Sequence, residues 1–139
     1  MGEAVKLSIN EDKKFTLKAN LCIWLVYATE VFRNHMQAEL AQCRNLNVEI
    51  IPLSSFTIDG IASSPQPDIV FIETGVNWAK KIIDLQNEDS NLQGQETSLV
   101  VFGNESDNGA LRIALRMGAS DFLSDKVSVS ELMPMLKRT

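Results

Sequence analysis

The sequence predicts an α/β protein built on a doubly wound, five-stranded parallel sheet with helices on both faces. Short, almost wholly apolar runs alternate with helical patterns, and such runs are typical of buried parallel strands. The 139 residues suit one domain, and 45% hydrophobic with 22% charged residues predict a packed core. The predicted strands cover residues 21–28, 48–53, 68–73, 98–103 and 121–124.

The segments between these strands show the spacing of amphipathic helices. Thr29 is the expected N-cap of the first helix, and Pro134 would delete one backbone donor inside the last one. Helices are expected over residues 29–43, 77–86, 106–119 and 128–138, with a weaker one over 54–63. The side chains expected to face the sheet are Phe32, Met36, Leu40, Cys43, Trp78, Ile82, Leu85, Ala110, Leu111, Ala114 and Leu115.

Residues 1–20 are polar and only weakly periodic, so we interpret them as an N-terminal arm or linker ahead of a domain over residues 21–139. Within the arm, the stretch KFTLKA (14–19) is a candidate edge strand. No internal repeat or low-complexity tract divides the chain further. The sequence therefore predicts one domain with a short N-terminal extension.

Charge and hydropathy restrict the cellular setting. The longest strictly apolar run, residues 21–28, falls far short of the roughly 20 residues that span a bilayer. The net charge of -5 argues against a nucleic-acid backbone or an anionic membrane surface as the main partner. Cys22 and Cys43 lie in apolar patterns, and His35 stands alone, which favours reduced thiols and a packing histidine over a metal site. We expect a cytoplasmic protein without direct membrane insertion.

One reversal of strand order, together with right-handed crossovers, gives the flavodoxin-like order 2-1-3-4-5. The carboxyl ends of strands one, three and four then surround a crevice, which is where such sheets bind ligands. Neither a P-loop nor a GxGxxG motif follows any of these strands, so a nucleotide phosphate site has little support. The expected rim residues are Tyr27, Ala28, Thr29, Glu30, Glu73, Thr74, Gly75, Gly103, Asn104, Ser124, Asp125 and Lys126.

Two stretches resemble the CheY-like receiver domains of response regulators. GALRIALRMGASDFLSDKVSVSEL (109–132) resembles their C-terminal part, in which an alanine-rich helix ends in Gly-Ala before an Asp-aromatic-Leu strand and a Glu-Leu helix. PDIVFIE (67–73) resembles their third strand, which ends on the phosphoacceptor aspartate. The resemblance implies a carboxylate nucleophile, two further acids that hold Mg²⁺, and a Thr or Ser with a Lys that bind the phosphoryl oxygens.

Most of these positions are changed in this chain. Tyr27 and Ala28 supply no carboxylate for Mg²⁺, and Asp125 would repel a phosphoryl group. The resemblance therefore implies a degenerate receiver, or pseudo-receiver, that is not an enzyme and needs no metal or cofactor. It places Glu73 at the phosphoacceptor, Tyr27 and Ala28 at the metal acids, Gly103 at the Thr or Ser, Asp125 with Lys126 at the Lys, and Phe122 at the aromatic switch.

Two interpretations of Glu73 stay open. Strand ends in such sheets face solvent, which favours a solvated side chain without a special role. Alternatively, the fixed negative charge of Glu73 imitates part of a phosphorylated aspartate, with about half of its charge.

The retained C-terminal half corresponds to the helix 4–strand 5–helix 5 face that receivers use for pairing. The resemblance therefore implies a non-catalytic, phosphorylation-independent interaction module with a protein partner, including a second copy, and a candidate surface at Arg112, Arg116 and Phe122. The two arginines, four residues apart, are also compatible with an ordinary solvated helix face.

The arrangement is similar to the N-terminal domain of the Tad/Cpa-type pilus-assembly localisation proteins. That likeness implies an attached C-terminal effector or ATPase domain and a role in pilus assembly or secretion. Two alternatives remain: a two-component phosphoacceptor that uses Glu73 or another carboxylate, and a small-ligand binder at the crevice. The loop YATEVF (27–32) lacks the Ser, Thr and Gly residues of a flavin phosphate cradle, which weighs against the second alternative.

Overall fold

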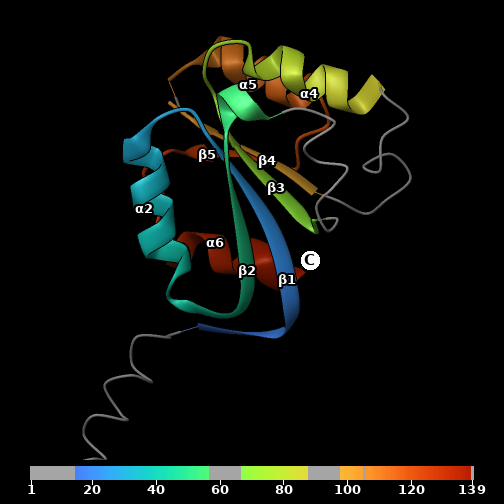
Figure 1. The fold of residues 1–139 in the computed structure, drawn as a ribbon. Coiled ribbons are helices and arrows are strands. Elements are labelled where there is room, and N and C mark those ends of the chain that lie inside the picture. The colour runs from blue at the N-terminus through green and yellow to red at the C-terminus, as the bar shows by residue number, and fades with distance from the viewer. Residues whose placement is uncertain (1–14, 57–66, 88–97, 105, 139) are drawn as a thin grey trace, which may run out of the picture.

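The computed structural model describes residues 15–56, 67–87, 98–104 and 106–138. One parallel sheet has the strand order β2-β1-β3-β4-β5, which confirms the predicted topology (Figure 1). Its strands are β1 (Phe15–Tyr27), β2 (Cys43–Pro52), β3 (Ile69–Glu73), β4 (Ser98–Gly103) and β5 (Asp121–Ser124). The helices are α2 (Glu30–Leu40), α4 (Trp78–Asn87), α5 (Asn108–Arg116) and α6 (Val129–Arg138), with a short 3-10 turn η1 (Leu53–Ser55).

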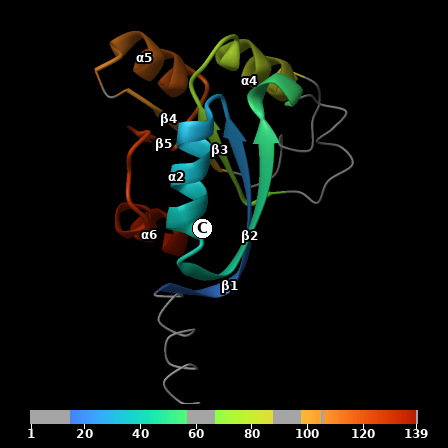
Figure 2. The same ribbon diagram turned by 60° about the vertical axis from the view of Figure 1, so that its left-hand side comes forward.

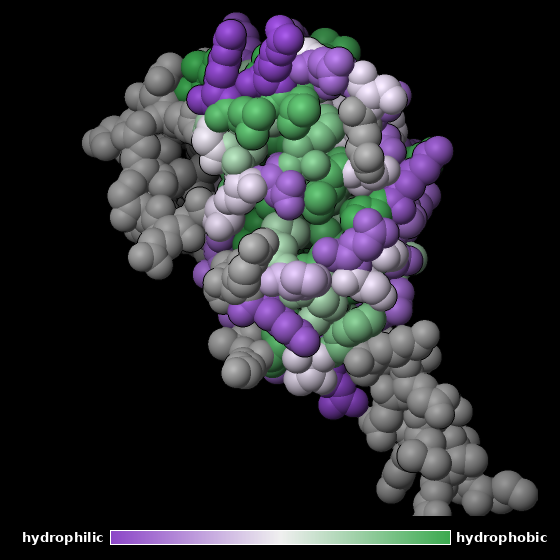
Figure 3. Space-filling view, turned by 180° about the vertical axis from the view of Figure 1, so that it is seen from behind, coloured by the Kyte–Doolittle hydropathy of each residue, from purple (hydrophilic) through white to green (hydrophobic). Residues whose placement is uncertain are grey.

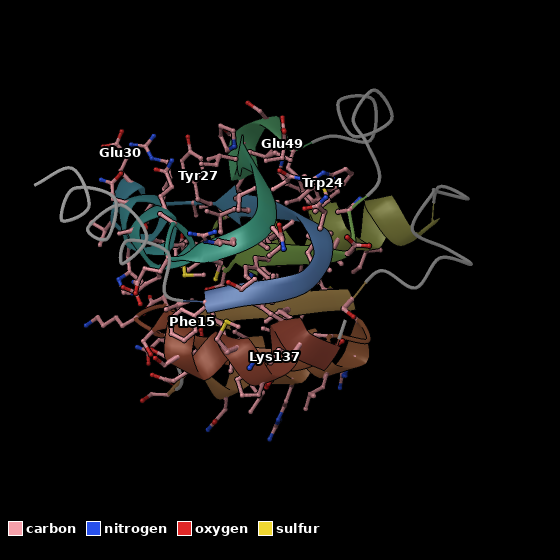
Figure 4. All side chains as sticks on the ribbon, turned by 90° about the horizontal axis from the view of Figure 1, so that it is seen from below. Phe15, Trp24, Tyr27, Glu30, Glu49 and Lys137 are labelled. Carbon is pink, nitrogen blue, oxygen red and sulfur yellow. The ribbon has the colours of Figure 1, made fainter. Side chains whose placement is uncertain are left out.

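The sheet lies between two helical layers (Figures 1 and 2). Helices α2 and α6 pack on one face and enclose one hydrophobic cluster, in which Phe102 contacts Phe32 and Phe71 at ring-centroid distances of 5.4 and 5.0 Å. Helices α4 and α5 pack on the other face around Trp24. Because successive side chains of a strand point to opposite faces, β1 sends Trp24 toward α4 and Tyr27 toward α2 (Figure 4).

Strand β1 combines the candidate edge strand at residues 14–19 with the strand predicted over residues 21–28. It starts at Phe15 and pairs there with Cys43 of β2, so the candidate strand is confirmed from Phe15 on, and residues 15–20 belong to the sheet and not to an arm. The register between β1 and β2 shifts between Thr16 and Leu21. This irregularity interrupts the apolar pattern, which explains why the first half of the strand does not look like a buried strand in the sequence. Residues 1–14 lie outside the described part.

Helix α2 begins as predicted, because the side chain of Thr29 accepts a hydrogen bond from the Phe32 amide. Its C-terminal end is a correction. The helix stops at Leu40, and Cys43 is buried as the first residue of β2 rather than as the last residue of a helical stripe. The weak helix predicted over residues 54–63 lies mostly outside the described residues, as does the side chain of Leu85.

Helix α5 differs from its prediction in one side chain. Ala110 and Ala114 are buried against the sheet, but Leu115 is 62% exposed. The helix ends at Arg116, and Gly118 follows with a φ of +80°, the left-handed conformation that stops a helix. Leu115 lies about 100° around the helix from Ala114, which turns it away from the sheet.

Two side chains of α2 form hydrogen bonds with the backbone at the start of α6. The Glu39 carboxylate accepts a hydrogen bond of 2.8 Å from the Val129 amide, and the His35 ring nitrogen Nε2 lies 2.6 Å from the Val127 carbonyl oxygen. A carbonyl oxygen only accepts, so His35 Nε2 is the donor. The helix keeps the predicted start and contains Pro134 on its exposed side. His35 is therefore half-buried and packs at a helix boundary, as expected.

The helices in the described part of the chain are all too short or too polar to cross a lipid bilayer.

Candidate functional site

The candidate site is the end of the sheet where β1, β3 and β4 finish, and we call it the strand-end site. Glu73 is the last residue of β3 and lies in register with Phe102 of β4. Ile69 and Phe71 belong to the cluster under α2 and α6, so the two-residue period of the strand turns Glu73 toward α2. Glu73 is only 6% exposed, which makes the interpretation as a solvated strand end wrong.

Both carboxylate oxygens of Glu73 are bonded to the residues that join β1 to α2. Oε1 accepts hydrogen bonds from the Ala28 amide at 2.6 Å and the Thr29 amide at 2.8 Å. Oε2 accepts a hydrogen bond from the Thr29 hydroxyl at 2.9 Å. Hydrogen bonds to an ionised acceptor are the stronger kind, so these three contacts tie β3 firmly to the start of α2.

Thr29 connects the carboxylate to the helix. Its hydroxyl donates to Glu73 and accepts from the Phe32 amide at 3.3 Å, and a hydroxyl can do both at once. The N-terminus of a helix carries a partial positive charge and unsatisfied amides, which favour an anion. Glu73 supplies that anion from inside the protein, in the way that a bound phosphate does in other proteins.

The second contact of the strand-end site joins β3 to β4. A Cβ atom on Gly103 would lie 2.7 Å from Thr74 Oγ1 and 3.3 Å from Phe122 Cζ. The side chain of Thr74 and the ring of Phe122 therefore occupy the space that a Thr or Ser at position 103 would need. In addition, the Thr74 amide donates to the Phe102 carbonyl at 2.9 Å, which continues the ladder past the end of β3.

A third close approach joins the loops after β1 and β3. A Cβ on Gly75 would lie 2.7 Å from Ala28 Cβ and 3.0 Å from Leu53 Cδ2. Ala28 and Gly75 are thus in direct contact, and a side chain at position 75 would meet Ala28 and Leu53. The absence of large side chains here lets the two loops close on each other.

The other predicted metal-acid position points elsewhere. Tyr27 packs on the α2 side of the sheet, where the Arg33 guanidinium lies 5.3 Å from its ring centroid (Figure 4). Such a cation over an aromatic ring is attracted by the ring's negative face. Tyr27 therefore covers a hydrophobic cluster instead of contributing a ligand. Within the described residues, no group of three or more His, Cys, Asp or Glu side chains is placed to hold a metal ion.

The residues that follow β5 form the last part of the strand-end site. Asp125 is half-buried and its amide donates to the Gly103 carbonyl at 3.2 Å, so its backbone extends the sheet. The Lys126 side chain is exposed, and its amide donates to the Ser124 hydroxyl oxygen. The candidate surface residues Arg112 and Arg116 are exposed on α5.

Sequence reasoning gave Glu73, Ala28 and Gly103 a place in the site, and it put Thr29 and Thr74 on the rim without assigning either a contact. Thr29 carried a signal, because an N-cap residue directly after a central strand must lie beside the neighbouring strand end. Thr74 carried none, because its importance depends on the missing side chain of Gly103.

Solved structures with the same fold are numerous, although no protein-family model and no curated protein sequence matches the chain. The pilus assembly protein CpaE from Caulobacter crescentus has a TM-score of 0.62 at 16% identity, over 86% of this chain and 93% of that one. The receiver domain of the response regulator NarL from Mycobacterium tuberculosis has 0.64 at 15% identity, over 87% and 99%. The BeF3-activated receiver domain of RstA from Klebsiella pneumoniae has 0.64 at 21% identity, over 84% and 96%. The chain therefore has the receiver fold.

Proposed function

We propose that this receiver-like domain is a non-catalytic protein-interaction module that works without phosphorylation. The observation that carries the proposal is the hydrogen bonding of Glu73. A carboxylate that attacks a phosphoryl donor needs a free oxygen, a metal to offset the incoming charge, and cations at the phosphoryl oxygens. Here both oxygens of Glu73 are engaged, and Asp125 brings negative charge where receivers have a lysine.

The shape of the site supports the same proposal. Thr74 and Phe122 occupy the space beside Gly103 that a hydroxyl-bearing side chain would need, and Ala28 lies against Gly75. Attack by Glu73 would require its release from two backbone amides and one hydroxyl, and it would leave those donors unsatisfied at a cost of about 1–3 kcal/mol each. Glu73 on this view is a structural anion that keeps the loops of the fold in one arrangement.

The experiment is incubation of the protein with acetyl phosphate and Mg²⁺, followed by intact-mass measurement, with a phosphorylatable receiver treated in parallel. We expect the mass of this protein to stay unchanged while that of the control receiver rises by one phosphoryl group. A phosphoryl adduct on this chain, mapped to Glu73 or to any other carboxylate, would establish the alternative function of a two-component phosphoacceptor.

We further propose that the module regulates or localises a pilus-assembly or secretion system through an attached C-terminal domain. The likeness of the fold to the pilus assembly protein CpaE supports this, together with the sequence resemblance described above. The full-length gene and its neighbours provide the test. An adjoining ATPase domain within a cluster of pilus genes is the expected result, and a gene context with neither would reject this part of the proposal.

A further inference from the structure

Helix α5 presents an exposed face with an unusual combination of side chains. Arg112, Leu115 and Arg116 fall within about 100° of the helix surface, so they form one patch in which Leu115 lies at one edge, Arg112 next to it and Arg116 beyond. Leu115 is 62% exposed, and Ile113 at the edge of the patch is 37% exposed. We call Arg112, Ile113, Leu115 and Arg116 the α5 patch. Seen from behind, hydrophobic residues gather on the described surface among hydrophilic side chains (Figure 3).

The α5 patch is positively charged, whereas the chain as a whole is negatively charged. The chain has 18 acidic and 13 basic residues, yet α5 contains two arginines and no acidic side chain. Among the described residues, neither guanidinium has an ion-pair or hydrogen-bond partner. Arginine at a surface usually finds a carboxylate when one is near, so two unpaired guanidinium groups beside an exposed leucine indicate a surface that is complementary to something acidic and apolar.

We propose that the α5 patch binds an acidic amphipathic segment of a separate partner protein, with an apolar side chain on Leu115 and carboxylates on Arg112 and Arg116. This rests on the proposed function and names the chemistry of the partner. The bidentate geometry of arginine suits carboxylates, and an exposed leucine beside the two arginines adds an apolar contact next to the ion pairs.

Electrostatics favours a separate partner over a second copy. A symmetric contact between two α5 patches would bring four arginines together without an acidic residue from either helix. In a symmetric dimer, the same patch faces itself, so this repulsion has no compensation inside the patch. A partner with the opposite charge gains both the ion pairs and faster association.

The probe is a synthetic amphipathic peptide of about 18 residues, or about five helical turns, with leucines along one face and glutamates beside them. Its affinity for the protein is measured by fluorescence anisotropy at low and high salt. The double variant Arg112→Glu with Arg116→Glu is compared with Lys80→Glu with Lys137→Glu, which makes the same change of charge at exposed residues of α4 and α6. Leu115→Ala tests the apolar contact, and thermal melting verifies that each variant is folded.

We expect the α5 charge reversal to weaken peptide binding at least tenfold, the control reversal to weaken it less than threefold, and Leu115→Ala to weaken it about tenfold. Binding should also weaken as salt rises. Equal losses in both reversals, or no saturable binding by the unmodified protein, would overturn the proposal. A dimer of the unmodified protein that the α5 reversal dissociates would also overturn it, because the occupant would be a second copy. None of these results bears on phosphorylation, so the proposed function is tested separately.

Discussion

The strand-end site and the α5 patch are opposite in almost every physical respect. At the strand-end site, a buried carboxylate has all of its hydrogen bonds satisfied from inside the protein, and small residues let the surrounding loops close. At the α5 patch, guanidinium groups have no partner among the described residues and a leucine is open to solvent. In this chain, the strand ends are satisfied by internal hydrogen bonds, whereas the polar groups of the α5 patch face solvent.

The strand-end site also differs from a receiver's site in where the carboxylate finds its partners. A receiver's phosphoacceptor needs groups brought from outside, namely a metal ion and a phosphoryl donor. Glu73 instead finds its donors in Ala28 and Thr29 of the same chain.

The largest effect is expected from Glu73→Ala. Removing the carboxylate leaves two amides and one hydroxyl without their acceptor, and the free energy of unfolding should fall by about 2–4 kcal/mol. Urea denaturation measures this. The control is Glu30→Ala, because Glu30 is an exposed acid in the first turn of the same helix and should cost only about 0.3–1 kcal/mol. Equal costs for both substitutions would mean that the Glu73 contacts add nothing beyond a general helix-end charge.

Introducing a hydroxyl at this position with Gly103→Thr should also destabilise the fold. The new Cβ would lie 2.7 Å from Thr74 Oγ1, and overpacking of this kind costs about 1–3 kcal/mol. Combining it with Thr74→Ala removes the obstructing atoms, so the double variant should be more stable than the sum of the two single effects predicts. Strict additivity in denaturation experiments would contradict the packing described for this position.

A smaller effect is expected at the start of α6. Glu39→Ala removes the acceptor of the Val129 amide, and the loss of a helix cap costs about 0.5–2 kcal/mol. Hydrogen exchange should show faster exchange at Val129, with little change at the start of α2. Glu131→Ala is the matched control, since Glu131 is exposed in the same helix and contacts only Ser128. Unchanged exchange at Val129 in Glu39→Ala would remove the role assigned to Glu39.

The smallest effect concerns Cys22, whose thiol pKa is raised above 9.0 by burial and then by the charges of Asp68 and Glu49. The unfolded thiol ionises first as pH rises, so this group favours the folded state below about pH 9 and loses that contribution at higher pH. Iodoacetamide at pH 8 should therefore modify Cys22 more slowly in the folded protein than in the urea-unfolded chain. A faster reaction in the folded protein would contradict the raised pKa.

The sequence predicted the sheet well because buried parallel strands are continuous apolar runs, as residues 69–72 and 99–102 are. It found only a candidate edge strand at residues 14–19, where β1 is irregular, and it placed Leu115 on the buried side of its helix, which was wrong. In the site, the sequence identified the residues at positions 73, 28 and 103. It could not predict the hydrogen bonds of Glu73, because these depend on which face of β3 Glu73 occupies and on how close the start of α2 lies to that face.

The central claim is that Glu73 itself occupies the strand-end site, and amide NMR spectroscopy tests it most directly. The amide signals of Ala28, Thr29 and Gly103 would be followed while Mg²⁺ and beryllium fluoride, a phosphoryl mimic used to activate receiver domains, are added. We predict no saturable change at these three amides. Saturable, Mg²⁺-dependent shifts confined to them would show that an outside anion and metal can replace Glu73, and would contradict the account.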